Sequence, residues 1–448
     1  MHKLRAVVVT AVIFVCFAAG FLSAENNADF KNVDQETFKQ LESKQWDSLI
    51  ETAKNAIDNG IDYYYLRLRL GIAYYNKAEY KWAAAQFEKA LSFNPWDEAA
   101  MEYAYYSYVF SADDAKANRM MTCFPEPMRE RFKVRSPRFF DSVNFEYGVG
   151  TSDNETQNGK IDIDGAANIY GEMTRFNDST YYHVGFKHWL GNYVSIYHGY
   201  SALSINMTKQ IRSGDIDIVS DKYTTSQTEY YFSPSVQVGR NTKITAAVHL
   251  INVSYDALKA TYNTTTGSYD TTRPNTTLNN SVSVLALSKD IGSATWSIFG
   301  SNSDLNKGKQ TEAGLGLAWF PKGTVNLYTN STVTSFSEKD ADSNMVFDQM
   351  VGLHLSGPAW LEGYVTSGNM KNFNEKNGFI VYNIGDEIKS RYGVSLLFYF
   401  TSGLNLSLRY QHAGKEASYV TFTSATASET HTVDYQAQTI IGGLQWKF

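Results

Sequence analysis

Two groups of side chains have residue types that could do chemistry, and both would bind a metal ion. Asp340, Asp342 and Asn344 have the D-x-D-x-N spacing with which a calcium-binding loop begins. The residues that should follow are absent, because Met345 replaces the turn glycine and Val351 replaces the bidentate glutamate. We therefore interpret this group as a solvated acidic loop.

Three histidines form the second group. His183, His188 and His198 are spaced so that they fall on neighbouring strands. Positions 183 and 188 differ in parity, so their side chains should face opposite sides of a strand and cannot share a metal ion. The sequence also has no nucleophile elbow, no glycine-rich phosphate loop and no HExxH motif. We expect no catalytic residue, no metal site and no cofactor, and predict that the chain is not an enzyme.

The segment 1–24 differs from the rest of the chain. Lys3 and Arg5 give a basic start, an apolar run follows, and Leu22-Ser23-Ala24 offers small residues for cleavage. This order predicts a secretory signal peptide over residues 1–24. Lipidation at Cys16 is disfavoured, because the residues before it are not small.

The composition limits the class of protein. The formal net charge is −6, and removal of two basic residues with the signal peptide makes it more negative, so we expect no nucleic-acid partner. Cys123 is then the remaining cysteine, and no intrachain disulfide can form. After the signal peptide, no apolar run is long enough to span a membrane as a helix. Aromatic residues make up 15% of the chain, which suits the aromatic girdles of a membrane β-barrel.

A repeat signature occupies residues 64–97. Small residues recur where two helices would touch, large rings fall between them, and a proline follows, at Gly71, Tyr74, Tyr80, Ala83, Phe87, Ala90 and Pro95. The pattern resembles the tetratricopeptide repeat. In such a repeat the small side chains let two antiparallel helices approach, and the proline ends the second helix.

The same pattern recurs on both sides of this segment, with the period of about 34 residues that is typical of such repeats. Trp46 precedes Tyr80 by one period, and Ala117 follows Ala83 by one period. We therefore predict repeats at about 30–63, 64–97 and 98–131, within a helical domain of residues 25–135. The resemblance implies a concave face that holds a peptide or protein partner. Six tyrosines could line this face or pack in the core: Tyr63, Tyr64, Tyr65, Tyr103, Tyr105 and Tyr106.

Beyond Pro137 the pattern changes to strict alternation. In residues 404–411, Leu404, Leu406 and Leu408 share one face, while Asn405, Ser407 and Arg409 share the other. Residues 229–238 and 312–319 alternate in the same way. An apolar face opposite a charged one is what lipid outside and water inside require.

The connections favour a membrane barrel over a soluble sandwich. Tight turns at 239–241, 290–292, 321–323, 357–358 and 402–403 alternate with predicted longer polar loops at 259–275, 304–308, 337–343, 372–387 and 419–432. Outer-membrane barrels have short periplasmic turns and long outer loops. About 15 strands can be recognised, and a single-chain barrel should have an even number. We predict 14 or 16 strands for residues 136–448, with 16 preferred.

The end of the chain carries a further signal. Alternating residues of one face lead to a terminal aromatic ring, at Ile440, Gly442, Leu444, Trp446 and Phe448. This terminus resembles the signal that the barrel assembly machinery reads. The fold class is therefore predicted as a two-domain α + β chain, with a short helical repeat domain before an antiparallel transmembrane β-barrel in the outer membrane.

The order of signal peptide, repeats and barrel resembles the outer-membrane components of exopolysaccharide export systems. The resemblance implies a periplasmic repeat domain that guides the polymer or binds partner enzymes, and a barrel that is the exit pore. Polar and acidic side chains predicted to face the lumen would suit a hydrated polysaccharide, namely Glu229, Glu312, Glu362 and Gln445. Two alternatives remain open: a barrel that anchors a periplasmic scaffold for a protein complex, and a general porin or small-molecule transporter.

Overall fold

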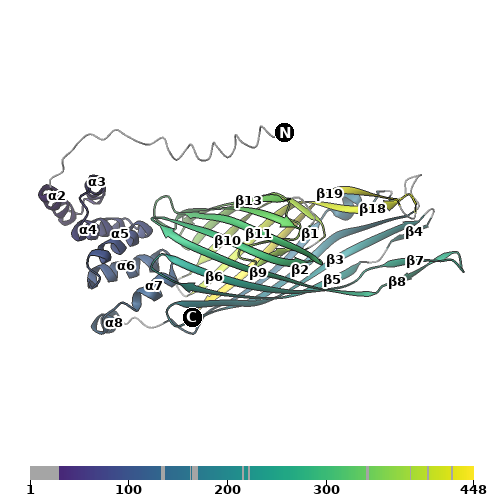
Figure 1. The fold of residues 1–448 in the computed structure, drawn as a ribbon, viewed down its shortest axis with the longest axis horizontal. Coiled ribbons are helices and arrows are strands. Elements are labelled where there is room, and N and C mark those ends of the chain that lie inside the picture. Colours follow the sequence, from purple (N-terminus) through teal and green to yellow (C-terminus); the bar gives the residue numbers. More distant parts are fainter. Residues whose placement is uncertain are drawn as a thin grey trace.

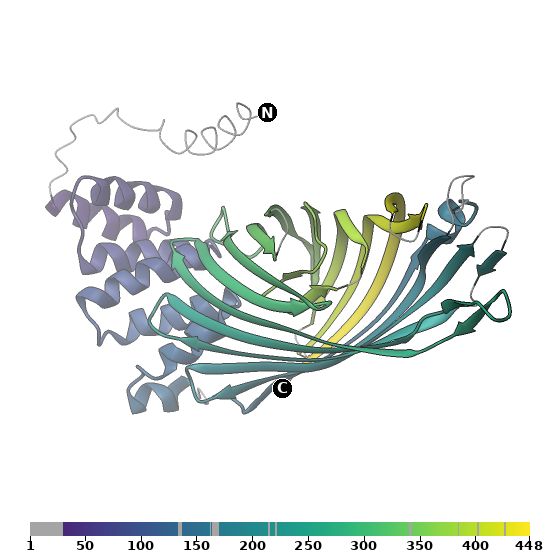
Figure 2. The same cartoon turned by 45° about the vertical axis from the view of Figure 1, so that its right-hand side comes forward.

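The computed structural model describes residues 30–132, 137–161, 163, 170–213, 216–219, 222–339, 343–383, 385–400, 403–424 and 427–448. A stack of helices lies at one end of a long β-barrel (Figures 1 and 2). We call the end of the barrel beside the helices the docked end, and the opposite end the far end. The predicted signal peptide of residues 1–24 lies outside the described residues.

The helical domain is built from helices whose starts recur at a fixed spacing. They are α2 (Phe30–Glu42), α3 (Trp46–Asp58), α4 (Tyr64–Asn76), α5 (Tyr80–Phe93), α6 (Glu98–Phe110), α7 (Asp114–Met121) and α8 (Glu126–Phe132). Helices α2, α4 and α6 begin at positions 30, 64 and 98, and helices α3, α5 and α7 begin at positions 46, 80 and 114. The helix pairs thus have the predicted period.

Close packing inside the central pair explains the small residues of the repeat signature. A β-carbon added at Gly71 would lie 2.6 Å from Cε1 of Phe87, so the ring fills the space that the missing side chain leaves. Ala83, Phe87 and Ala90 are fully buried, and Tyr74 is buried beside them. Among the described residues, no helix is long and apolar enough to cross a membrane.

The barrel wall consists of long antiparallel strands. They are β1 (Phe140–Ser152), β2 (Tyr170–Leu190), β3 (Val194–Ser213), β5 (Tyr223–Gln237), β6 (Thr242–Asp256), β9 (Asn275–Ile291), β10 (Ala294–Leu305), β11 (Gly308–Trp319), β12 (Leu327–Glu338), β13 (Asn344–Ser356), β14 (Ala359–Ser367), β17 (Glu387–Tyr399), β18 (Leu404–Phe422) and β19 (Ser428–Lys447). Each pairs with its neighbours along the chain, and β1 also pairs with β19 from Ser142↔Lys447 to Ser152↔Ala437. That last ladder closes the barrel.

In the part of the chain that the structure describes, the wall has 14 strands. The preferred count of 16 was wrong, and the lower even number is the correct one. The connection from β1 to β2 contains the short helix α9 (Asn154–Asn158). With 14 strands, β1 begins and β19 ends at the docked end, so the direction of every strand is consistent.

Most tight turns lie at the docked end, as predicted, but the long loops predicted at 304–308 and 419–432 were wrong. β10 and β11 are joined by a tight turn in which Asn306 and Lys307 both have positive φ, the conformation of a type I′ hairpin. Residues 419–422 and 428–432 continue β18 and β19 as a paired ribbon. Shorter strands extend the far end: β4 (Ile216–Val219) on β3, and the hairpin of β7 (Lys259–Asn263) and β8 (Ser268–Thr272) (Figure 1).

The barrel buries polar side chains and exposes apolar ones. Leu315 and Leu285 are 62% and 61% exposed, whereas Arg175 and Glu312 on inward-facing positions are 1% and 2% exposed. A soluble sandwich would have the opposite distribution. The apolar exterior and the closed hydrogen-bond ladder together identify a transmembrane barrel.

Candidate functional site

The interior of the barrel is the candidate site, and the predicted lumen residues lie in it. Glu229 pairs with His249 at 3.2 Å, and Glu362 accepts a hydrogen bond of 2.7 Å from Tyr328. On β18 and β19, Asn405 donates to Gln445 at 2.8 Å. The alternation of polar and apolar residues thus placed the inward and outward faces correctly.

A connection between two strands folds into this lumen. Residues 368–386 link β14 to β17, and they contain the small hairpin of β15 (Phe373–Glu375) and β16 (Ile380–Tyr382). We call the described residues of this connection, 368–383 and 385–386, the inner hairpin. The sequence predicted an outer polar loop over 372–387, and that prediction was wrong.

The inner hairpin reaches across the lumen to the opposite wall. Tyr231 donates a hydrogen bond to the carbonyl oxygen of Asn377 at 3.0 Å, and His249 Nδ1 lies 2.8 Å from the carbonyl oxygen of Gly378. The ring of Phe379 lies 5.1 Å from the ring of Tyr231, centroid to centroid. Positive φ angles at Lys376, Asn377 and Gly378 make the tight tip that fits inside the barrel.

Charged groups hold the base of the inner hairpin. Arg391 on β17 binds Glu375 at 2.6 Å, and its guanidinium lies 3.5 Å from Asp348 on β13. Glu312 accepts a hydrogen bond of 2.8 Å from the backbone N–H of Asn374. The inner hairpin therefore narrows the lumen as an ordered element. The run Phe379 to Tyr382 was the sequence signal for it, because consecutive apolar and aromatic residues do not suit a loop in water.

The docked end is covered by the helical domain. The backbone N–H of Lys81 donates to the carbonyl oxygen of Gly323 at 2.8 Å, and Asn192 donates to the carbonyl oxygen of Asn118 at 2.9 Å. Gly323 has a φ of +65°, and the indole of Trp82 occupies the place that a β-carbon there would need. The contacts come from α5, α7 and the residues beside them, and they reach the turns after β2, β5, β9 and β11.

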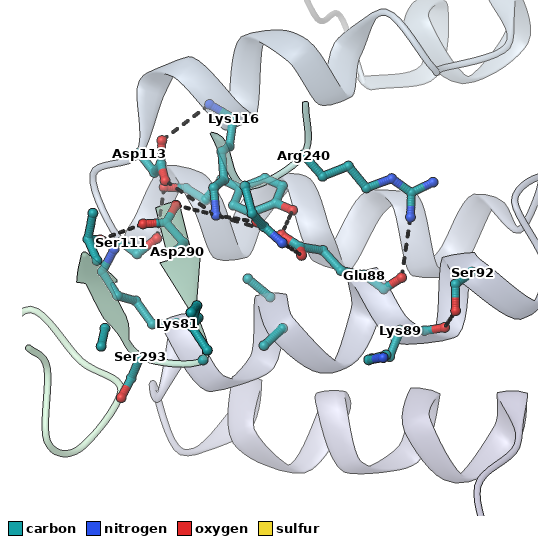
Figure 3. A pocket seen from close by; sticks show the side chains of 18 residues that line it. Lys81, Glu88, Lys89, Ser92, Ser111, Asp113, Lys116, Arg240, Asp290 and Ser293 are labelled. Carbon is teal, nitrogen blue, oxygen red and sulfur yellow. Dashed lines mark hydrogen bonds and ion pairs between the residues drawn. The ribbon is translucent and has the colours of Figure 1, made fainter. Parts of the chain in front are cut away.

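Lys116 is the central cation of this docking interface (Figure 3). Its Nζ lies 2.7 Å from Asp290 and 3.7 Å from Glu88, and it donates to Asn241 at 2.8 Å. Burial would lower the pKa of Lys116, but the carboxylates of Glu88, Asp290 and Asp113 outweigh it and raise the pKa. The ammonium group is therefore charged and links a helix to two strand turns.

Asp114, which begins the same helix, binds the barrel wall itself. Its carboxylate lies 2.8 Å from Nζ of Lys447 on β19 and 3.4 Å from Nζ of Lys187 on β2. Burial would raise the pKa of Asp114, but these two lysines outweigh it and lower the pKa. Residues 111–115, which connect α6 to the first turn of α7, thereby extend over the mouth of the lumen.

A cavity of about 760 Å³ lies between residues 111–115 and the barrel wall, and we call it the vestibule. Serine, glutamine, lysine and aspartate side chains line it together with aromatic rings from several strands. The aromatic residues are Trp189, Phe320, Tyr328, Trp360 and Tyr399. Sequence reasoning did not identify the vestibule, because its residues come from segments as distant in the chain as Lys81 and Tyr399 and share no local motif.

Exposed apolar side chains also lie on the helices α2, α4 and α6. Phe38, Tyr65, Val109 and Phe110 are exposed there, and the barrel does not cover them. The six tyrosines that were predicted to line the concave face or pack in the core lie in two environments. Tyr65 is exposed, whereas Tyr63, Tyr64, Tyr103 and Tyr105 pack against the core and Tyr106 is half-buried.

The remaining residues of the repeat signature flank α5. Tyr80 is half-buried and begins the helix, and Pro95 is exposed just beyond its end at Phe93. At the end of the chain, Ile440, Gly442, Leu444 and Trp446 lie on β19. The side chains of Ile440, Leu444 and Trp446 are exposed on the outer face. Phe448 is exposed, and its backbone N–H donates to the carbonyl oxygen of Asp141 at 2.9 Å.

Of the two candidate metal groups, only the histidines lie entirely within the described residues, and they do not come together. His183 faces the lumen, where its ring nitrogens lie 2.9 Å from Ser201 Oγ and 2.7 Å from Tyr197 Oη. His188 and His198 face each other at 3.0 Å on the other side of the wall. Asp340 and Asp342 lie outside the described residues. Among the residues that are described, no three His, Cys, Asp or Glu side chains could hold a metal ion together.

Comparisons with known proteins give similar structures but no similar sequence. No family model matches the chain, and no curated protein matches it. The Pseudomonas putida toluene transporter TodX is similar over 69% of this chain and 90% of its own, with 8% identity and a TM-score of 0.44. A bacterial polysaccharide outer-membrane secretin is similar over 68% and 98%, with 7% identity and a TM-score of 0.33. A mutant of MamA is similar over 21% and 55%, with 21% identity and a TM-score of 0.20.

Proposed function

We propose that this chain is a gated pore of the outer membrane that takes part in the export of an extracellular polysaccharide. In this proposal the helical domain lies in the periplasm and covers the inner mouth of the barrel. The observation that carries the proposal is a polar lumen with a vestibule at the docked end, where residues 111–115 cover the mouth, and with the inner hairpin across it. A hydrated polymer needs such a polar, water-filled path.

The inner hairpin favours a gated pore over a general porin. A general porin conducts small solutes at all times and therefore needs a lumen that stays open. Here two separate elements narrow the path, and each is held by charged groups, Arg391 for the hairpin and Lys116 for the helical domain. Ion pairs of this kind can be broken and re-formed when a domain moves, so they suit a gate.

The exposed apolar surface on α2, α4 and α6 favours a second candidate, a scaffold that recruits a periplasmic protein. Phe38, Tyr65, Val109 and Phe110 remain exposed when the domain is docked on the barrel. Exposed apolar side chains of this kind can contribute to a protein interface. We propose that this surface binds a periplasmic partner, and that Phe448 is recognised by the barrel assembly machinery during insertion.

Conductance in planar lipid bilayers separates the two candidates. The full-length chain should show low conductance, and deletion of residues 372–383 should raise it several-fold because one of the two elements that narrow the lumen is then removed. The matched control is deletion of residues 259–272, since the β7–β8 hairpin projects from the far end (Figure 1). If the chain that lacks residues 372–383 folds but shows no conductance, the barrel is an anchor and the scaffold proposal replaces the pore.

A further inference from the structure

We propose that the vestibule is a binding site for an anionic saccharide. Its aromatic rings would contact the C–H faces of the sugar, and the ammonium groups of Lys81 and Lys243 would bind the carboxylate. This inference rests on the proposed pore function and names the class of substrate that the pore would recognise. It follows from three properties of the vestibule wall.

The first property is a set of aromatic rings on inward-facing positions. The rings of Phe320 and Tyr328 are stacked with centroids 5.9 Å apart, and those of Trp360 and Tyr399 meet edge to face at 5.2 Å. Trp189 lines the same cavity from β2. With Phe320, Tyr328, Trp360 and Tyr399, it gives five aromatic rings in the wall of one cavity. A sugar ring has flat C–H faces that pack on such rings.

The second property is the polar lining between the rings. Ser195, Ser235, Gln237 and Ser288 line the vestibule from the barrel strands. A hydrocarbon ligand would desolvate these groups without replacing their hydrogen bonds, which costs free energy. A ligand with many hydroxyl groups replaces them. The wall therefore suits a saccharide better than an apolar molecule.

The third property is a pair of lysines, Lys81 and Lys243, that have no ion-pair partner among the described residues although three lysines and three aspartates line the vestibule. Asp290 is paired with Lys116 at 2.7 Å, and Asp114 is paired with Lys447 at 2.8 Å. Lys81 and Lys243 also line the vestibule, and in the described part of the chain no carboxylate lies within ion-pair distance of either Nζ. Nζ of Lys81 instead lies 4.4 Å from the centroid of the Phe320 ring. The cations beside the aromatic rings thus remain available for an anionic ligand.

The size and position of the vestibule agree with this assignment. A cavity of about 760 Å³ is in the range of small-molecule sites and large enough for a few sugar units of a longer chain. It lies on the path of the lumen, directly behind residues 111–115. A polymer that entered the barrel from the docked end would meet these side chains first.

Calorimetric titration of the purified full-length protein with two oligosaccharides tests the inference. The probes are tetragalacturonate, which is acidic, and maltotetraose, which is neutral. We expect the acidic probe to bind at least tenfold more tightly at low salt, with the difference decreasing as salt is added. Because the inner hairpin and the helical domain cover the vestibule, the titration is repeated on the chain that lacks residues 372–383, in which the site is accessible from the far end.

Matched variants identify the groups responsible. Lys243→Gln and Lys81→Met together should reduce the affinity for tetragalacturonate to that for maltotetraose, whereas Lys322→Gln at the nearby turn should have no effect. Trp360→Leu should weaken the binding of both probes. Trp296→Leu, on the outward face of β10, should change neither.

Each outcome bears on one part of the proposal. Equal affinity for the two probes in the unmodified protein would overturn the role of the lysines. Failure of both probes to bind the chain that lacks residues 372–383, while that chain conducts ions, would overturn the saccharide site and leave the pore intact. Binding without conductance in any variant would overturn the pore, so the two failures are distinguishable.

Discussion

The elements of the helical domain and of the barrel each have an apolar face and a polar face, but the apolar face is buried in the helical domain and exposed on the barrel. In the helical domain Leu49, Leu66 and Phe87 are fully buried, as in any water-soluble protein. In the barrel Leu285 and Leu315 are among the most exposed apolar side chains. The comparison shows that an apolar stripe specifies a contact with something apolar, and the surroundings decide whether that is protein or lipid.

The two regions also differ in how they obtain a stable structure. The helices depend on close side-chain packing, which is why Gly71 has Phe87 directly above it. The barrel depends on a closed ladder of backbone hydrogen bonds, completed by the pairing of β1 with β19. Substitutions that enlarge or charge a side chain should therefore lower the stability of the two regions by different amounts.

The largest effect is expected for a charge on the lipid-facing side of the barrel. Leu408→Arg should reduce the free energy of unfolding by roughly 2–4 kcal/mol, because Leu408 is half exposed on the outer face. Ser407→Arg, at the preceding position and facing the lumen, should have little effect, since Arg409 already lies on that face. Urea unfolding in lipid vesicles measures both. Similar losses for the two variants would contradict the inside-out assignment.

A somewhat smaller and local effect is expected in the helical domain. Gly71→Leu should cost about 1–3 kcal/mol or more, because the new side chain must displace the Phe87 ring from a packed core. Limited proteolysis of the full-length protein should then digest residues 30–132 and leave the barrel resistant. Ser92→Leu, at an exposed position of α5, is the control and should not be digested faster. Equal resistance of both variants would contradict this packing.

The smallest effect is expected at the interface between the two regions. Asp114→Asn should loosen the docked domain slightly, whereas Asp47→Asn, at an exposed ion pair within the helical domain, should not. The distance between spin labels on Cys123 and on a cysteine introduced at Asn263 reports the docking. An unchanged distance distribution for Asp114→Asn would mean that its ion pairs do not hold the domain.

The pH dependence of docking has a definite sign. Lys447 and Lys187 lower the pKa of Asp114 below its ordinary value of 3.8, against the opposing effect of burial. A carboxylate with a lowered pKa stabilises the docked state above its ordinary pKa and loses this effect as the pH falls through the lowered value. The label distance should therefore be constant from roughly pH 5 to pH 8 and broaden only in acid below pH 3.8.

The sequence by itself determined the elements that depend on periodicity. The fixed spacing of the repeat signature located the helix pairs, and the alternation of Leu406 with Ser407 and of Leu444 with Gln445 assigned the two faces of the wall. Both patterns are local, because each residue's environment follows from its position within one helix or one strand. The strand count was less certain, since the polar segment after Ser152 has no clear period and contains the helix α9.

Only the tertiary structure decided where the connections lie and which distant residues meet. Residues 372–387 were predicted as an outer loop, and nothing local indicates that Asn377 and Gly378 bond to Tyr231 and His249 across the lumen. The vestibule has the same origin, because Lys81 and Lys243 meet there only after a helical domain docks on a closed barrel. Long-range contacts of this kind depend on the curvature of the wall and on the docking of one domain on another, and a one-dimensional pattern contains neither.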